Sequence, residues 1–116
     1  QMLEHGPGFA KARLQISPNH LNSVDTVHGG VLFALADAAF SVASNSHGAV
    51  SVSIQASIAN FQAVREGALS ASAREVARNP KLATYSVEVR DDSGSLVALF
   101  QGTVYRKSMT LEQMLG

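Results

Sequence analysis

Residues 28–45 constrain the fold most, because they predict a helix that is apolar all round. The stretch is rich in alanine and leucine, contains no proline and, after Gly29-Gly30, continues for about four turns. Its large apolar side chains point in every direction around a helix rather than along one stripe; they are Val31, Leu32, Phe33, Leu35, Phe40 and Val42. A helix of this kind is buried on all sides. The rest of the chain is therefore expected to surround it.

Two features of this helix point to chemistry. Asp37 stands alone among apolar residues, and a carboxylate is costly to bury without a partner. Gly29 and Gly30 offer no side chain to cap the first amides, so these N–H groups are available for an anion or a developing oxyanion. The alternative is that Thr26 or Asp25 caps the helix and that Asp37 is a satisfied core carboxylate. The residue types alone leave both interpretations open.

The composition indicates one globular domain and argues against several kinds of partner. At 116 residues and 46% hydrophobic content, the chain is long enough to bury about two thirds of its surface in a single core. Asp37 interrupts the longest apolar run and no signal-like segment is found, so no membrane association is expected. Nine basic and nine acidic residues cancel without a block of like charge, which argues against nucleic acid. The absence of cysteine excludes a thiol nucleophile and fits a cytoplasmic location.

Alternation of apolar and polar residues predicts five strands around the helix. The first covers residues 9–16 and follows an expected loop leader at residues 1–8. The other four strands follow the helix, at residues 50–58, 69–73, 83–89 and 96–105. In the second strand, one face is expected to carry all the apolar side chains: Val50, Val52, Ile54, Ala56 and Ile58. Residues 110–113 resemble a capping box for a last short helix, within a tail at residues 107–116.

These elements predict an α+β fold in which a five-stranded, mostly antiparallel sheet wraps around one long central helix. Short turns between the later strands imply the antiparallel arrangement. Residues 1–116 are expected to form this single domain. Because one sheet cannot cover every side of the helix, its outer side is expected to meet a second copy of the chain.

A set of motifs extends in a fixed order from the first predicted strand to Tyr105. They are Asn22, His28-Gly29-Gly30, residues 32–37, Asn45, Asn60-Phe61-Gln62-Ala63, Gly67 and Asp91-Asp92-Ser93-Gly94. In this order and spacing they resemble the signature of the hotdog-fold acyl-CoA thioesterases, most closely the PaaI type of the phenylacetate pathway. The resemblance implies hydrolysis of a small, aromatic coenzyme A thioester, of phenylacetyl or hydroxyphenylacetyl type. It also implies a homotetramer and no cofactor beyond the coenzyme A of the substrate.

The resemblance also assigns roles to residues. Asp37 matches the aspartate that acts as nucleophile or general base, and the first helix amides, around Gly29, match those that polarise the thioester carbonyl. Asn22 matches the loop asparagine that helps to place the carbonyl or water. Ser41, one turn after Asp37, matches a position where a hydroxyl can position water. Asp25 departs from the pattern, because relatives often have glycine there.

The spacing of Gly29 and Asp37 requires two helices to build one site. Eight residues separate them, so along one helix they lie about 12 Å apart, too far to reach the same carbonyl carbon. If a second subunit packs its helix antiparallel, its Asp37 lies beside Gly29 of the first. The expectation is therefore a homodimer with two composite sites.

The remaining candidates have less support. His28 is a possible acid or base, although a histidine followed by two glycines is more often a structural hydrogen-bonding residue. His5, His20 and His47 share no metal-ligand spacing, so no metal site is expected. Two other functions stay open: a hotdog dehydratase or hydratase, whose pattern rests on a catalytic histidine in another context, and a noncatalytic acyl-CoA binding module, which does not need Asp37.

Overall fold

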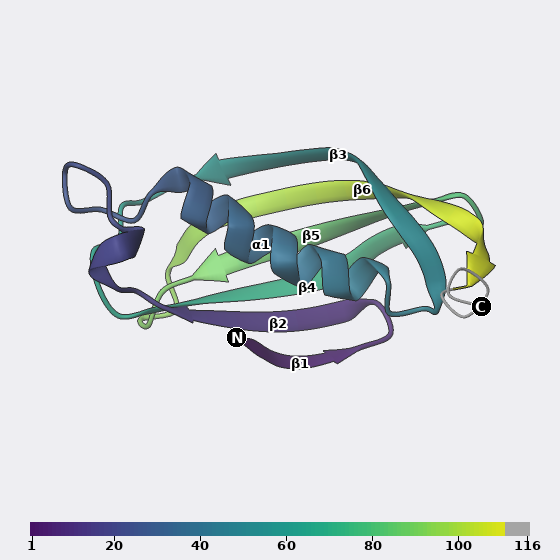
Figure 1. Ribbon diagram of the computed structural model, residues 1–116, viewed down its shortest axis with the longest axis horizontal. Helices are drawn as coiled ribbons and strands as arrows, with labels where there is room; N and C mark the ends of the chain where they lie inside the picture. Colours follow the sequence, from purple (N-terminus) through teal and green to yellow (C-terminus); the bar gives the residue numbers. More distant parts are fainter. Residues whose placement is uncertain (111–116) are drawn as a thin grey trace.

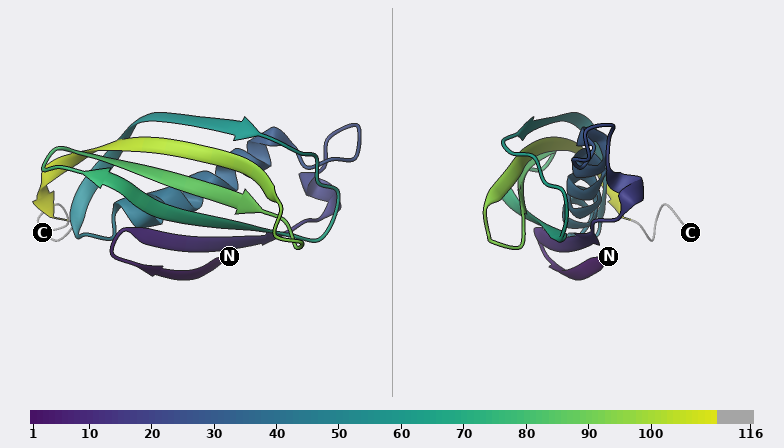
Figure 2. Two further views of the ribbon diagram at one scale, coloured as in Figure 1. Left: turned by 180° about the vertical axis from the view of Figure 1, so that it is seen from behind. Right: turned by 90° about the vertical axis from the view of Figure 1, so that its left-hand side faces the viewer.

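The computed structural model describes residues 1–110, which form one helix against one antiparallel sheet. In chain order the elements are β1 (Met2–Gly6), β2 (Phe9–Gln15), η1 (Pro18–His20), α1 (Gly29–Ser44), β3 (Ala49–Asn60), β4 (Ala68–Arg78), β5 (Leu82–Arg90) and β6 (Leu96–Thr110). The strand order in the sheet is β1-β2-β4-β5-β6-β3. The sheet curves around α1, which lies along its inner side (Figures 1 and 2). The predicted fold class is therefore confirmed.

The sheet has six strands rather than the predicted five. Residues 2–6, expected to be a loop leader, form β1 and pair antiparallel with β2. The sequence did not reveal this strand because Leu3, Glu4 and His5 are all exposed and show no alternation between a buried and a wet face. At the other end, β6 continues to Thr110, beyond the predicted end at residue 105. The expected last helix, apart from Thr110, lies outside the described residues.

The prediction of one apolar face for β3 is wrong. Its pairing with β6 shifts at Ile54, between the pairs Ser53–Val104 and Gln55–Thr103. On one side of the shift Val52 pairs with the exposed Tyr105, and on the other Ile58 pairs with the fully buried Phe100. An extra residue in one strand reverses the alternation beyond it. Val52 therefore faces away from α1, whereas Ile58 faces the helix side.

Aromatic side chains hold α1 against the sheet. Phe40 of the helix contacts Tyr85 edge to face, with ring centroids 5.9 Å apart, and lies 5.3 Å from Phe100. All three rings are buried. A Cβ atom at Gly102 would lie 2.7 Å from the Phe40 ring, so this strand position must lack a side chain for the helix to approach so closely.

The sheet covers only one side of α1, although the composition predicted burial all round. The buried helix residues are Leu32, Leu35, Ala36, Ala39, Phe40, Ala43 and Ser44. Ala34, Ala38 and Ser41 are exposed on the other side. This uncovered side fits the expectation that one sheet cannot enclose the helix. No helix within residues 1–110 is long and apolar enough to cross a membrane.

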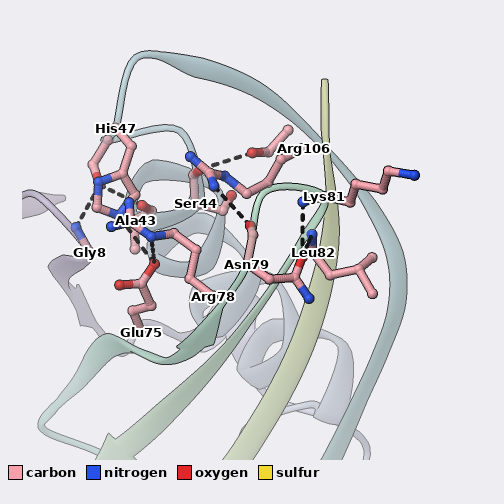
Figure 3. A network of polar contacts seen from close by, with 12 residues as sticks. Gly8, Ala43, Ser44, His47, Glu75, Arg78, Asn79, Lys81, Leu82 and Arg106 are labelled. Carbon is pink, nitrogen blue, oxygen red and sulfur yellow. Dashed lines mark hydrogen bonds and ion pairs between the residues drawn. The ribbon is translucent and has the colours of Figure 1, made fainter. Parts of the chain in front are cut away.

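A network of polar contacts ties the C-terminal end of α1 to the sheet (Figure 3). The hydroxyl of Ser46 accepts a hydrogen bond from Gly8 N at 2.7 Å and donates one to Ala43 O at 2.6 Å. Glu75 Oε1 lies 3.2 Å from His47 Nε2 and 3.4 Å from Arg78 Nε. The network thus joins the turn between β1 and β2, the end of the helix and β4.

Tyr85 lies beside this network with its hydroxyl fully buried and without a hydrogen-bond partner among the residues described. Burial, and after it the charge of the nearby Glu75, raise the pKa of Tyr85 to about 12. The hydroxyl therefore keeps its proton in the folded protein well above the pH at which a free tyrosine ionises.

Candidate active site

The helix begins with its first amides largely satisfied by His28. His28 Nδ1 accepts a hydrogen bond from Gly30 N at 2.9 Å. Its carbonyl accepts from Val31 N at 2.9 Å and from Leu32 N at 3.3 Å. Of the first four helix amides, only that of Gly29 has no partner within residues 1–110. The candidate oxyanion donor is therefore a single N–H group at the positive end of the helix dipole.

The cap itself differs from both sequence-based interpretations. The first amides are not all free, because the ring nitrogen of His28 takes one of them. Neither Thr26 nor Asp25 caps the helix, and the Thr26 hydroxyl instead donates to Asn22 Oδ1 at 3.2 Å. Serine, threonine, aspartate and asparagine are the preferred N-caps, so a histidine cap was not anticipated. His28 has a structural hydrogen-bonding role here.

The two glycines lack side chains for different reasons. A Cβ atom at Gly30 would lie 3.1 Å from His28 Nδ1, so Gly30 keeps room for the capping ring. A Cβ atom at Gly29 would meet Asn60 Nδ2 at 3.7 Å, an ordinary contact distance. The packing of the chain therefore does not require glycine at residue 29. Space beside a free amide is what an approaching carbonyl oxygen needs.

Asn22 shapes the loop that leads into the helix. Its Oδ1 atom accepts hydrogen bonds from Val24 N at 3.0 Å and from Thr26 N at 3.2 Å. This arrangement is an Asx turn, and it leaves Asn22 Nδ2 for other contacts. Within the turn Asp25 has a φ of 60°, in the left-handed region that favours glycine. That conformation explains why glycine suits this position and why aspartate, which tolerates it, can replace glycine.

Asp37 is half-buried and has no hydrogen-bond or ion-pair partner in the described part of the chain. Within the described chain, no residue satisfies Asp37 as the interpretation of a core carboxylate requires. The structure does not bring Asp37 to Gly29, since eight helical residues separate them by about 12 Å along the axis. Ser41 lies one turn after Asp37 and is exposed on the uncovered side of α1. One chain thus holds both halves of a site without joining them.

A hollow of about 440 Å³ adjoins the start of α1 and was not anticipated from the sequence. We call it the α1–β2 hollow; its lining includes Leu14, His20, His28, Val31, Ala34 and Leu35. His20 was considered only as a metal ligand. The structure brings it next to His28, because Leu21 and Val27 form an isolated bridge and His28 N donates to His20 O at 2.9 Å. Two apolar residues that flank a polar loop are the only sequence signal of this bridge.

Comparison with known proteins identifies the class of this chain. Residues 25–98 match the family model described as Thioesterase superfamily. The chain therefore belongs to the thioesterase superfamily and is a hydrolase that acts on thioesters.

The relatives narrow the resemblance to one type within that family. A relative from Archaeoglobus fulgidus is 45% identical over 91% of this chain and 70% of its own length. Acyl-coenzyme A thioesterase PaaI from Escherichia coli is 33% identical over 90% of this chain and 75% of that protein. A mutant of the phenylacetic acid degradation protein PaaI from Thermus thermophilus superposes with a TM-score of 0.88 at 40% identity, covering 92% of each chain. These findings confirm the hotdog fold and the likeness to PaaI.

Proposed function

We propose that this protein hydrolyses a small, aromatic coenzyme A thioester, with Asp37 as nucleophile or general base. The observation that carries the proposal is the pairing, on one helix, of a carboxylate without a partner and an amide without a partner. Asp37 and Gly29 N–H are the two groups that thioester hydrolysis needs. The names of the Escherichia coli and Thermus relatives support coenzyme A and an aromatic acyl group.

A homodimer completes the site in this proposal. Antiparallel packing of two α1 helices places Asp37 of the partner subunit beside Gly29. The uncovered side of α1, which exposes Ala34 and Ala38, supports such packing because isolated apolar helix faces are unfavourable in water. The edge strand β3 also exposes a large apolar side chain, since Ile54 is 58% exposed. By its likeness to PaaI the protein is expected to be a homotetramer built from two such dimers.

The reaction follows from these positions. The thioester carbonyl oxygen accepts a hydrogen bond from Gly29 N–H, which stabilises the negative charge that develops on it. Asp37 of the partner subunit attacks the carbonyl carbon, or it takes a proton from the water that attacks. The C–S bond then breaks, and coenzyme A leaves as a thiolate that takes up a proton. On the nucleophilic route, water finally hydrolyses the mixed anhydride on Asp37.

Replacement of Asp37 tests the chemistry. Asp37→Asn keeps the size of the side chain but removes its charge and basicity, so kcat should fall by about a hundredfold to ten-thousandfold. The melting temperature should change little, because Asp37 has no partner to lose in the chain. Release of free thiol from phenylacetyl-CoA measures kcat, and Glu4→Gln, an exposed carboxylate on β1, is the control. A folded Asp37→Asn oligomer with the wild-type rate would exclude this mechanism. If the wild-type protein binds thioesters but never cleaves them, the result would favour a binding module.

A mixing experiment tests whether the site is composite. Asp37→Asn and Gly29→Val chains should each keep less than about a tenth of the wild-type kcat on their own. In a mixed dimer one site carries both defects and the other carries neither. If equal amounts of the two chains are refolded together and pair at random, half of the dimers are mixed, so about a quarter of the wild-type activity should return. A site within one chain predicts no recovery on mixing. A monodisperse monomer in light scattering would also contradict the composite site.

A further inference from the structure

The open side of Gly29 faces the end of β3, where Asn60 is the last residue of the strand. Outside the helix backbone and the adjacent residues, a Cβ atom at Gly29 would have one neighbour within 4 Å in the described chain. This neighbour is the side-chain amide nitrogen of Asn60, at 3.7 Å. In Figure 1 the arrowhead of β3 likewise lies beside the start of α1. A carbonyl oxygen bound at the free amide of Gly29 is therefore close to a second N–H donor.

Strand pairing fixes the direction in which Asn60 points. Asn60 pairs with Ala98 of β6, and Ile58, two residues earlier, pairs with Phe100. Ala98 and Phe100 are fully buried, and Phe100 contacts Phe33 of α1 with the ring centroids 5.3 Å apart. Paired residues of antiparallel strands have their side chains on the same face of the sheet. Asn60 thus points from a strand toward the side of the sheet that holds α1, which gives a catalytic group a rigid base.

The side-chain amide of Asn60 is available to a ligand. Asn60 is exposed, and its side chain has no hydrogen-bond partner within residues 1–110. By contrast, the amide of Gln62, two residues later, donates to Asp91 Oδ2 at 2.9 Å. Asn22 uses its Oδ1 atom to hold its own loop, and none of its atoms lies within 4 Å of the Cβ position at Gly29. Of the two asparagines, Asn60 is the one beside the free amide.

The carboxylate of the proposed site belongs to the same side of α1. Gly29, Phe33 and Asp37 follow one another at intervals of four residues, so they lie along one side of the helix. The ring of Phe33 contacts β6, so this side looks toward β6 and the edge strand β3. Ser41, one turn after Asp37, already lies on the uncovered side. In the proposed dimer, Asn60 and the partner's Asp37 can therefore reach the same carbonyl group.

We infer that Asn60 is a second oxyanion donor, which donates a hydrogen bond from Nδ2 to the thioester carbonyl oxygen beside that from Gly29 N–H. The inference rests on the proposed function and adds a catalytic residue to it. When the nucleophile bonds to the carbonyl carbon, an electron pair of the C=O bond moves onto the oxygen, and both donors stabilise this charge. The pair returns when the C–S bond breaks and the thiolate leaves. Because the charge is largest in the transition state, the two donors act mainly on kcat.

Replacement of the donor tests this role. Asn60→Leu has nearly the size of asparagine but no side-chain N–H group. Its kcat for phenylacetyl-CoA should fall by about tenfold to a thousandfold, whereas KM should change by less than about threefold. Gln62→Leu is the matched control, because it removes another exposed amide of the same segment, and its kcat should stay at the wild-type value. Asn60→Asp, which has acceptors in place of the donor, is a second variant and should lose at least as much activity.

The infrared band of a bound thioester measures the hydrogen bond itself. Phenylacetyl-CoA labelled with carbon-13 at the carbonyl should stay intact on the Asp37→Asn protein, and each hydrogen bond to its oxygen lowers the C=O stretching frequency. Addition of Asn60→Leu to Asp37→Asn should move the band to higher frequency. Addition of Gln62→Leu should leave it in place. A purely structural role of Asn60 predicts the same band in all three folded proteins.

Two results would overturn the inference. The first is a folded Asn60→Leu protein, by circular dichroism and melting temperature, with the wild-type kcat and an unmoved infrared band. The second is a raised KM with an unchanged kcat, which would mean that Asn60 contacts the bound substrate without stabilising the oxyanion.

Failure of the proposed function is distinguishable from failure of this inference. If the wild-type protein binds phenylacetyl-CoA without cleaving it, the proposed function fails, and the infrared band of the wild-type and Asn60→Leu complexes still decides whether Asn60 donates. If the wild-type protein cleaves the thioester and Asn60→Leu cleaves it equally fast, only the inference fails. A wild-type protein that neither binds nor cleaves this thioester would overturn both.

Discussion

The two ends of α1 use their polar groups in opposite ways. At the C-terminal end Ser46, His47 and Glu75 join three segments of the chain through hydrogen bonds and close charged contacts (Figure 3). At the N-terminal end Gly29 N–H has no partner within the described chain, and the space beside it is open. The comparison teaches that this fold places its stabilising contacts at one end of the helix and leaves the other end available for a ligand.

Among changes at the two ends of α1, the largest effect is expected from filling the space beside the Gly29 amide. Gly29→Val should lower kcat by more than about tenfold, because its branched side chain blocks the approach of an oxygen to the amide. The melting temperature should stay near that of the wild type, since the chain leaves room for a Cβ atom at this position. The kcat of Gly29→Ala should lie between those of the wild type and Gly29→Val. A folded Gly29→Val protein with the wild-type kcat would show that this amide does not contact the substrate.

Weakening the contacts at the C-terminal end of α1 should affect stability and not chemistry. Glu75→Gln removes the charge that His47 and Arg78 share, on a side chain only 23% exposed. The free energy of unfolding in urea should fall by about 1–2 kcal/mol, while kcat stays unchanged. Glu88→Gln is the matched control, because the Glu88 and Arg90 side chains are 38% and 44% exposed, and such pairs contribute less than about 1 kcal/mol. A change in kcat on Glu75→Gln would mean that the two ends are coupled.

The pH dependence of the free energy of unfolding should report on Tyr85, beside the C-terminal end of α1. An unfolded tyrosine ionises near pH 10, whereas the folded protein holds the Tyr85 proton until about pH 12. The folded state therefore binds more protons in this interval, so wild-type stability should fall as the pH rises from 10 toward 12. Tyr85→Phe should remove this contribution. It should also raise stability at neutral pH by up to about 1 kcal/mol, because it removes a buried hydroxyl without a partner. Urea unfolding at neutral pH and at several pH values from 10 to 12 measures how the free energy of unfolding depends on pH. An identical pH dependence in Tyr85→Phe would show that Tyr85 is not the group responsible.

The smallest effect on stability is expected from Asp25→Gly, in the loop that precedes α1. Asp25 already adopts a left-handed backbone conformation, so Asp25→Gly should change the free energy of unfolding by no more than about 1 kcal/mol. Asp25→Val should destabilise the protein more, because a branched side chain is strained at this φ. Thermal unfolding of the three proteins measures the difference. Equal stability of the valine and glycine variants would argue that the loop relaxes to another conformation.

Periodicity predicted the elements that bury a regular face, and it failed where no such face exists. The helix at residues 29–44 and the alternation of buried and wet residues in β5 follow directly from the sequence. β1 was missed because its three central residues are all exposed, so its sequence shows no alternation of buried and wet positions. The shift at Ile54 was missed because the residues on both sides still alternate in type.

The site was predicted to the extent that one residue type identifies it. A lone carboxylate in an apolar helix singled out Asp37, and the paired glycines indicated the helix start. The orientation of the His28 ring decides which of the two glycines has the free amide, because its Nδ1 accepts from Gly30 N. The α1–β2 hollow depends on a bridge between Leu21 and Val27, across a loop whose geometry Asn22 sets. Contacts of this kind arise from three-dimensional loop structure, which residue spacing does not encode.

The register shift at Ile54 has a consequence for how homologous sequences are aligned. Alignments normally place gaps in loops, but here the extra residue lies within a strand. A homologue with a regular β3 would need a one-residue gap opposite Ile54. Without that gap, Val52 would be matched to a residue on the opposite face, and a covariation analysis would pair it with interior positions instead of Tyr105. Insertions and deletions at residue 54 therefore deserve separate treatment from those in the turns.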